Sequence, residues 1–240
     1  DICINLVGIL FENKKNNFKN IHINFPTLLS EKSRNYKLKQ FIHVSALGIE
    51  KAIDSEYAKS KLKGEENILN NFSSSTILRP SLVYSVDDNF TTNIMTLLSL
   101  LPVFPLYYNG NTKFSPIHVS DFCEIIVKIL DESISSEIIE CVGPEKLSFK
   151  EIIKKLLIAI DKKTFLLPVP TIIAKIIAFF LEKLPTPLIT RDQLRLLKYD
   201  NILSQENKSN IDIGFKSKLK FDEEIVKYSY MWKKGGQYSK

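Results

Sequence analysis

Short apolar runs alternate along the chain with longer stretches in which apolar residues recur every three or four positions. The short runs are rich in β-branched and aromatic residues and predict strands, whereas the longer stretches predict helices that pack one face on a sheet. We expect strands at Ile2–Leu6, Phe41–Ser45, Ser75–Arg79 and Ile138–Val142. Strands that alternate with helices in this order predict an α/β fold with a parallel sheet, and the first strand is expected to be apolar and buried at the rim of that sheet.

The same pattern places five helices along the chain. They are expected over residues 16–33, Ser55–Asn71, 87–101, Ser148–Ile160 and Thr171–Lys183, with Ser55 as the N-cap of the second. Pro26 lies inside the first of these and has no backbone N–H, so we expect a bend or an early stop near Phe25. Residues 102–105 contain two prolines and predict a loop, which leads into a turn around Asn109-Gly110.

Three chemically active side chains are expected to converge at the end of the second strand. Ser45 ends that strand, and Tyr57 and Lys61 are four residues apart on the helix that follows, so they share one face. A lone phenol titrates near ~10, but a neighbouring ammonium would lower its pKa and a serine hydroxyl could hold a substrate oxygen beside it. The spacing of Tyr57 and Lys61 alone is weak evidence, because it also arises by chance on solvated helices.

These residues and their neighbours resemble the short-chain dehydrogenase/reductase superfamily. Lys61-x-x-Gly64-Glu65 and Leu78-Arg79-Pro80-Ser81 look like its extended and atypical branches. The resemblance implies an α/β, Rossmann-like doubly wound parallel sheet that binds NAD or NADP. It also implies roles for three catalytic residues: Tyr57 as general acid/base, Lys61 on the nicotinamide ribose, and Ser45 orienting a substrate carbonyl.

The resemblance further implies which backbone segments face the cofactor. Besides Tyr57 and Lys61, the cofactor-binding residues are expected to be Leu6, Val7, Gly8, Pro80, Ser81, Leu82 and Val83. The run Asn5-Leu6-Val7-Gly8 is similar to the family's fourth strand, and the eight glycines form no G-x-G-x-x-G pattern for a pyrophosphate. We therefore expect an N-terminally truncated chain that lacks the first strands. Residues 1–145 would form the dinucleotide-binding domain, with some substrate-lobe segments, and residues 146–240 a small, mainly helical lobe.

The last third of the chain narrows the resemblance. Five features follow one another there: Leu167-Pro168-Val169-Pro170, an apolar helix, Pro185-Thr186-Pro187, Thr190-Arg191-Asp192-Gln193 and Asp200-Asn201. This order resembles the nucleotide-binding accessory subunit of respiratory complex I, the NADH:ubiquinone oxidoreductase, and its bacterial relatives. The likeness implies a structurally held cofactor, complex I subunits as partners, and a peripheral place on the cytoplasmic side of the respiratory membrane or the mitochondrial matrix side.

Two other functions stay open. One is an active NAD(P)-dependent oxidoreductase or epimerase of the NAD-dependent epimerase/dehydratase type, which would use Ser45, Tyr57 and Lys61. The other is a free-standing quinone- or steroid-type reductase, which shares the fold but not the Thr190–Gln193 motif. The small-molecule substrate is unknown in either case, and the residue that would separate NAD from NADP is expected to precede this sequence.

Composition excludes several other classes. The net charge of +6 comes mainly from lysine, and no basic helix is interleaved with aromatic residues, so nucleic acid is not an expected partner. Three scattered histidines predict no metal site, and the three cysteines are expected to be buried free thiols. No segment reaches the ~18 apolar residues of a membrane-spanning helix.

The helix over Thr171–Lys183 has too many apolar residues for a single stripe, so coverage on more than one side is expected. It is interpreted as a core helix of the small lobe. The alternative is that it docks on a protein partner or lies at a membrane interface, with Lys175 and Lys183 reaching toward water. The lysines near the C-terminus would suit an anionic lipid surface, although simple solvation explains them equally well.

Overall fold

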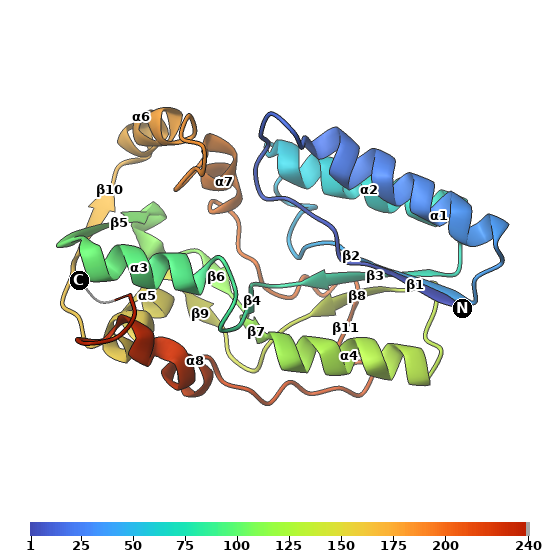
Figure 1. Ribbon diagram of the computed structural model, residues 1–240. Helices are drawn as coiled ribbons and strands as arrows, with labels where there is room; N and C mark the ends of the chain where they lie inside the picture. Colours follow the sequence, from blue (N-terminus) through green and yellow to red (C-terminus); the bar gives the residue numbers. More distant parts are fainter. Residues whose placement is uncertain (239–240) are drawn as a thin grey trace.

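A five-stranded parallel sheet forms the centre of the larger of two lobes in the computed structural model, which describes residues 1–238 (Figure 1). The strands follow the order β1 (Ile2–Asn5), β2 (Gln40–Val44), β3 (Ser75–Pro80), β8 (Ile138–Cys141) and β11 (Lys208–Ser209), each parallel to its neighbour. This arrangement confirms the α/β, Rossmann-like class that the sequence predicts.

Helices cover both faces of this sheet. A π-helix (η1, Lys19–Asn24), α1 (Phe25–Asn35) and α2 (Glu56–Asn71) lie on one face, and α4 (Val119–Asp131) lies on the other (Figure 1). Successive residues of β2 point to opposite faces: Phe41 packs with Ile68 of α2, whereas Ile42 packs with Ile125 of α4. Burial on both faces explains why consecutive residues are apolar in the middle of each strand, Phe41-Ile42 in β2 and Ile77-Leu78 in β3.

The first strand lies at the rim of the sheet, as predicted. Its expected burial is wrong, because β1 pairs only with β2 and leaves Ile2 and Ile4 exposed. Asn5, at its carboxyl end, is buried and donates to Nδ1 of His43 over 2.9 Å. The first strand is therefore fixed at its polar end.

The helix predicted over residues 16–33 forms, but it neither stops nor breaks at Pro26. The wider π-helical turn ends at Asn24, and Pro26 occupies the first turn of α1, where a missing N–H is tolerated. Gly64 of α2 faces this turn: a Cβ atom there would lie 1.9 Å from the carbonyl oxygen of His22. The glycine therefore allows η1 and α2 to pack with their backbones close together.

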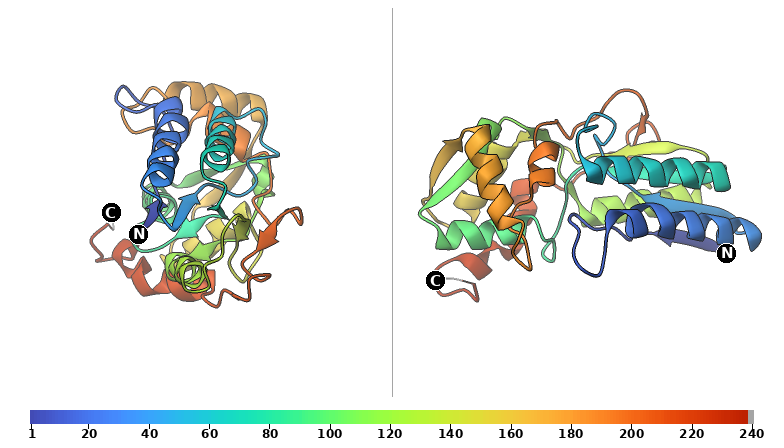
Figure 2. Two further views of the ribbon diagram at one scale, coloured as in Figure 1. Left: turned by 90° about the vertical axis from the view of Figure 1, so that its right-hand side faces the viewer. Right: turned by 90° about the horizontal axis from the view of Figure 1, so that it is seen from above.

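The smaller lobe combines segments from both halves of the chain. Its main elements are α3 (Thr91–Leu100), β5 (Val103–Tyr107), α5 (Phe149–Ala159), β10 (Phe165–Val169), α6 (Thr171–Leu181), α7 (Arg191–Leu196) and α8 (Phe221–Ser229). Met95, Leu98, Ile152, Leu156 and Ile225 share its core. The chain also returns from this lobe to the central sheet as β11, so the two lobes interleave (Figure 2).

Short elements join and complete the two lobes. They are β4 (Val83–Tyr84) paired with β7 (Ile117–His118), β6 (Lys113–Phe114) paired with β9 (Leu147–Ser148), and the 3-10 helices η2 (Tyr108–Gly110) and η3 (Tyr230–Trp232). The loop predicted for residues 102–105 is wrong, because residues 103–107 form β5 beside β10. A proline is tolerated there since a two-stranded sheet leaves one edge of each strand unpaired.

Two expectations about side-chain burial also need correction. The helix α6 buries only Ala174 and Ala178, so the prediction of a core helix covered on several sides is wrong. Of the three free cysteines, Cys141 is buried, Cys3 is half-buried and Cys123 is exposed, so the prediction of three buried thiols holds for Cys141 alone.

Candidate functional site

Lys61 reaches the carboxyl edge of the sheet from the side of α2. Its ammonium donates to the carbonyl oxygen of Val44, the last residue of β2, over 3.2 Å. A Cβ atom on Gly8 would lie 3.2 Å from the same Nζ atom. Burial lowers the pKa of Lys61 to about 8, although the nearby Glu65 opposes that shift. The structure thus brings together Lys61, Gly8 and the end of β2, at the edge where parallel sheets bind ligands.

Tyr57 is buried one helical turn before Lys61, within an aromatic cluster. The rings of Phe18 and His22 meet the Tyr57 ring edge-on, with centroids 5.9 Å and 5.3 Å away. Burial, with a further contribution from the charge of Glu65, raises the pKa of Tyr57 above its ordinary value. The expected lowering by Lys61 is therefore wrong in direction, since loss of solvent around the phenol outweighs the neighbouring cation.

Ser45 lies directly after β2, as predicted, and its hydroxyl has no hydrogen-bond partner within the described residues. Burial raises the pKa of the Glu65 carboxyl, and the neighbouring Ser45 hydroxyl opposes that shift. In the structure Ser45 lies beside Glu65, whereas the Tyr57 ring packs against Phe18 and His22. The Ser45 hydroxyl lies beside the Glu65 carboxyl without a hydrogen bond of good geometry, so a bound ligand could still accept from it.

His22 is a member of this site that the sequence analysis missed. Its Nε2 accepts the backbone N–H of Ile9 over 3.1 Å, and its Nδ1 lies 2.8 Å from Oγ of Ser60. Because the Ser60 hydroxyl donates to the carbonyl oxygen of Tyr57, the network assigns the proton to Nδ1 of a neutral imidazole. Burial and then the charge of Lys61 lower the pKa of His22 to about 3. The sequence signal that could have predicted its place is its spacing of four residues from Phe18, which puts both rings on one face of the expected helix.

The first group of predicted cofactor residues follows β1. Leu6 and Val7 are exposed, and the backbone N–H of Val7 donates to the side chain of Asn5 over 3.1 Å. Gly8 then passes beneath Lys61. These three residues therefore present exposed backbone at the edge of the sheet, beside the Lys61 ammonium.

The second group, Pro80, Ser81, Leu82 and Val83, runs from β3 into the smaller lobe. Ser81 is buried, and its hydroxyl contacts the carbonyl oxygen and the side chain of Asn201 over 3.0 Å and 2.6 Å. The same oxygen accepts the backbone N–H of Ser115. The Ser81 hydroxyl is thus committed to joining the lobes, while Val83 pairs with Ile117.

The Thr190–Gln193 motif holds the helix that carries Tyr57 and Lys61. Asp192 accepts the backbone N–H groups of Glu56 and Tyr57 over 2.9 Å and 3.0 Å, and the hydroxyl of Ser55 over 2.8 Å. Ser55 is the residue predicted to cap α2, and it does so by accepting from the N–H of Ala58. A carboxylate at a helix N-terminus satisfies free N–H groups and complements the helix dipole.

The residues at the carboxyl edge fit one end of a dinucleotide. A buried ammonium, an unpartnered Ser45 hydroxyl and the exposed backbone of 6–8 lie around the ends of β1 and β2. Lys61 could donate to ribose hydroxyls, and Ser45 could donate to a carbonyl or amide oxygen. Within the described residues, no cluster of His, Cys, Asp and Glu could hold a metal ion.

The fold and these residues together define a Rossmann-like α/β protein with a parallel central sheet. A UDP-glucuronic acid 4-epimerase from Bacillus cereus, solved with UDP-glucuronic acid and NAD, matches at a TM-score of 0.67 and 16% identity, over 95% of this chain and 75% of that chain. A dTDP-glucose 4,6-dehydratase from Bacillus anthracis, solved with NAD, matches at a TM-score of 0.67 and 13% identity, over 99% and 74%. At these identities the likeness shows the fold.

Curated relatives point to a more particular class. The mitochondrial NADH-ubiquinone oxidoreductase 40 kDa subunit of Neurospora crassa is 28% identical over 89% of this chain and 56% of its own length. The mitochondrial NADH dehydrogenase [ubiquinone] 1 alpha subcomplex subunit 9 of Arabidopsis thaliana is 26% identical over 85% of this chain and 54% of its own. No family model matches. The resemblance to complex I accessory subunits is therefore confirmed, and the chain spans about half the length of these relatives.

Proposed function

We propose that this chain is an NAD(P)-binding protein of the complex I accessory-subunit type, which holds its cofactor as a structural element and docks to a membrane-bound respiratory complex. The environment of Tyr57 carries the proposal. Its phenol is buried against Phe18 and His22, and its pKa is raised. A phenol with a raised pKa is a poor acid or base near neutral pH, whereas its helix can still hold a cofactor.

The cofactor would supply a nicotinamide ring able to take or give a hydride. In the proposed complex Lys61 holds the nicotinamide ribose, and the backbone of Leu6, Val7 and Gly8 lies along the same edge. Ser45 donates its free hydroxyl to the carboxamide end. Solved proteins of this fold that contain NAD support the assignment of a dinucleotide, NAD or NADP.

An active oxidoreductase or epimerase is the second candidate. Two observations favour it. The Ser45 hydroxyl has no hydrogen bond of good geometry, and the pKa of Lys61 is about 8, so the Lys61 ammonium can titrate close to physiological pH. In that reaction Tyr57 would exchange a proton with the substrate oxygen, and Ser45 would orient that oxygen. The raised pKa of Tyr57 argues against it.

Complex I subunits as partners and a peripheral position at the respiratory membrane form part of the same proposal. They rest on the names of the curated relatives, which are mitochondrial subunits of that complex. In the part of the chain that the structure describes, no helix is long and apolar enough to cross a membrane. The side of the membrane would be the cytoplasmic side in a bacterium or the matrix side in a mitochondrion.

The decisive experiment follows the cofactor of the natural full-length protein. The protein should purify with a dinucleotide that exchanges slowly, and with respiratory-complex subunits. Tyr57→Phe should leave both the dinucleotide and the subunits bound, since the structural role needs no proton transfer from the phenol. Steady oxidation of the nucleotide by carbonyl substrates that is abolished in Tyr57→Phe would instead establish the enzyme, and absence of any bound nucleotide would overturn both.

A further inference from the structure

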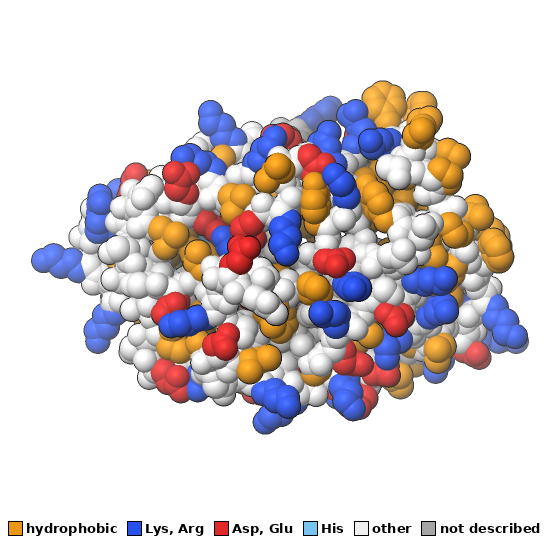
Figure 3. Space-filling view, turned by 180° about the vertical axis from the view of Figure 1, so that it is seen from behind, with side chains coloured by type: hydrophobic (Ala, Val, Ile, Leu, Met, Phe, Trp, Pro, Cys, Tyr) orange, Lys and Arg blue, Asp and Glu red, His pale blue; other side chains and the backbone are white. Residues whose placement is uncertain are grey.

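An extended exposed apolar surface follows β10, α6 and the segment after it. Ile172 and Phe180 of α6 are 74% and 63% exposed. The exposed apolar residues of this surface are Phe165, Leu167, Ile172, Ile173, Ile176, Ile177, Phe179, Phe180, Leu184 and Leu188. Figure 3 shows hydrophobic side chains gathered at the corner of the molecule where α6 lies, with lysine and arginine side chains beside them. A patch of this kind marks an interaction site.

The helix α6 has the size of an interfacial helix. It contains 11 residues, which at 1.5 Å per residue gives about 16 Å, far less than the ~30 Å of a bilayer core. Lys183 follows it, with its ammonium 4.2 Å from the centroid of the Phe179 ring. Large apolar side chains with a cation at the helix end are typical of helices that lie flat in a membrane surface.

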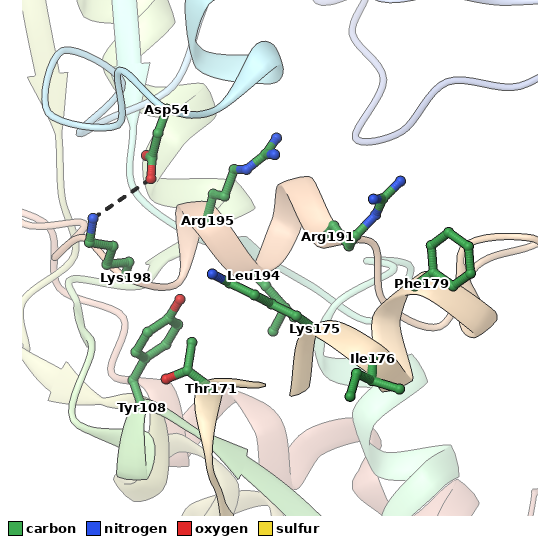
Figure 4. Close-up of a pocket in the computed structure, with 10 residues that line it drawn as sticks. All are labelled: Asp54, Tyr108, Thr171, Lys175, Ile176, Phe179, Arg191, Leu194, Arg195 and Lys198. Atoms are coloured by element: carbon green, nitrogen blue, oxygen red, sulfur yellow. Dashed lines mark ion pairs between the residues drawn. The ribbon is translucent and has the colours of Figure 1, made fainter. Parts of the chain in front are cut away.

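A cation-lined cavity opens beside this helix. It has a volume of about 710 Å³ and lies between α6, α7 and the loop before α2 (Figure 4). Four cations line it, Lys175, Arg191, Arg195 and Lys198, with Asp54 as the one carboxylate among its lining residues. Ile176 and Phe179 line it as well and belong to the apolar surface of α6. The cavity therefore has both cationic side chains and apolar residues of the α6 surface in its lining.

Not all of this charge is neutralised by the protein. Arg191 pairs with Glu182 over 2.6 Å, Arg195 with Asp192 over 3.2 Å, and Lys198 with Asp54 over 3.7 Å. Asp192 is at the same time occupied by the N-terminus of α2. Within the described residues, Lys175 of α6 has no ion pair. An anion in the cavity would meet Lys175 without displacing an acidic partner.

We propose that this cavity binds the phosphate headgroup of an anionic phospholipid while α6 lies flat in the membrane interface, with its isoleucine and phenylalanine side chains among the acyl chains. The inference rests on the peripheral membrane position in the proposed function and names the chemistry that provides it. Lys175 and the two arginines contact the phosphate, because a guanidinium and an ammonium are strong donors to phosphate oxygens. Ile176 and Phe179 contact the acyl chains of the lipid between the headgroup and the interior of the bilayer.

A lipid fits this surface better than a protein partner does. The exposed face of α6 is entirely aliphatic and aromatic between Lys175 and Glu182, without the polar groups that give a protein interface its hydrogen bonds. Cations lie beside this apolar surface: Lys175, Arg191, Arg195 and Lys198 at the cavity, and Lys183 over the Phe179 ring. This arrangement matches the headgroup layer and acyl layer of a membrane.

Sedimentation with vesicles tests the proposal directly. The full-length protein should bind vesicles of phosphatidylcholine with 30% phosphatidylglycerol at least about tenfold more tightly than pure phosphatidylcholine, and the difference should shrink in high salt. Phe180→Asn should weaken binding to the anionic vesicles about tenfold, since one large side chain no longer enters the bilayer. Lys175→Glu should remove most of the preference for anionic lipid, and Lys175→Gln part of it.

Matched controls lie elsewhere on the surface. Val127 on α4 is 53% exposed and Lys32 on α1 is exposed, so Val127→Asn and Lys32→Glu should bind as the parent protein does. Inorganic phosphate at millimolar concentration should not displace the protein from vesicles, because it lacks the acyl anchor. Unchanged thermal unfolding of each variant shows that the fold is intact.

Several outcomes would overturn the inference. Equal binding to neutral and anionic vesicles would rule out the proposed headgroup site. An unaltered preference for anionic lipid in Lys175→Glu would rule it out as well. Absence of vesicle binding, with co-purification of respiratory subunits lost in Phe180→Asn, would assign α6 to a protein partner instead. In each of these cases retained dinucleotide and retained respiratory subunits in the parent protein would leave the proposed function standing, so the two failures are distinguishable.

Discussion

The backbone N–H of Tyr57 donates a hydrogen bond of 3.0 Å to the carboxylate of Asp192, 135 residues later in the chain. The same carboxylate receives the N–H of Glu56 and the hydroxyl of Ser55. The smaller lobe therefore supplies the N-terminal cap of the helix that carries Tyr57 and Lys61. The Asp192 side chain thereby links α7 directly to the start of α2.

Removal of this cap should destabilise the protein. We expect Asp192→Ala to lower the free energy of unfolding by about 1–2 kcal/mol, because three donors lose their acceptor and the helix dipole loses its counter-charge. Urea unfolding measures the loss, and hydrogen exchange at the amides of Glu56 and Tyr57 locates it. Asp87→Ala is the control, since Asp87 is exposed, and it should change stability by less than about 0.5 kcal/mol. Unchanged exchange at those two amides in Asp192→Ala would contradict the prediction.

Gly64→Ala tests the close approach of η1 and α2. Alanine is favoured over glycine within a helix by about 1 kcal/mol, so a purely local effect would stabilise the protein. The added Cβ atom, however, would lie 1.9 Å from the carbonyl oxygen of His22, and backbone must move. We expect a net loss of about 1–3 kcal/mol in urea unfolding. Asn70→Ala, at an exposed position of the same helix, should be neutral or slightly stabilising, and a stabilised Gly64→Ala would disprove the contact.

The motif pieces Gly64-Glu65 and Arg79-Pro80 meet in a buried ion pair. Nε and Nη2 of Arg79 donate to the two carboxylate oxygens of Glu65 over 3.1 Å and 2.5 Å, and Glu50 pairs with the same guanidinium. Both Arg79 and Glu65 are buried. A buried pair of this kind is costly to break from one side, because an uncompensated charge remains.

A double-mutant cycle on this pair should show strong coupling. Glu65→Leu and Arg79→Leu should each cost about 3–5 kcal/mol, whereas the double variant should cost much less than their sum. Chemical denaturation of the four proteins gives the coupling energy. The exposed pair Lys63–Glu66 on α2 provides the comparison and should couple by less than about 0.5 kcal/mol. Additive effects at Arg79 and Glu65 would show that the pair contributes nothing specific.

Most strands of the central sheet could be predicted from local sequence patterns. The strand that ends at Ser45, the Ser55 cap and the helix through Lys61 could be predicted because each depends on residues close in sequence. The cap by Asp192 could not, since it joins segments 135 residues apart and a Thr-Arg-Asp-Gln string also reads as a local helix start. The direction of the Tyr57 pKa shift escaped prediction for a related reason, because Phe18 and His22 enclose the phenol from another element.

The apolar helix α6 shows a second limit of sequence patterns. Periodicity states how many faces of a helix are apolar, but it does not state what covers them. Ala174 and Ala178 are the buried residues of α6 and Leu181 packs beside them, whereas its isoleucine and phenylalanine side chains remain exposed. A core helix and an interfacial helix of this length have the same apolar composition, so only the packing separates them.

Acid should destabilise the fold through two buried histidines. Burial, followed by the charge of Lys61, lowers the pKa of both His22 and His43 to about 3 from an ordinary value of 6.5. Between these values the unfolded chain binds more protons than the folded chain, so stability is complete above pH 6.5 and falls as the pH decreases. Each histidine contributes up to about 1.4 kcal/mol per pH unit in that range.

Urea unfolding at pH 7.5, 6.0 and 5.0 measures this slope. Glu65 acts on it in the opposite direction, because burial raises the pKa of its carboxyl to about 7 and the folded chain then takes up that proton first. His22→Gln should flatten the slope by about the share of one histidine, since an amide can replace both hydrogen bonds, to Ser60 and Ile9, without taking up a proton. His118→Gln should flatten it less, because His118 is only half-buried and its Nδ1 accepts a single N–H, that of Ser120. A slope in His22→Gln equal to that of the parent protein would show that His22 is already protonated in the fold, contrary to the hydrogen-bond network around Tyr57.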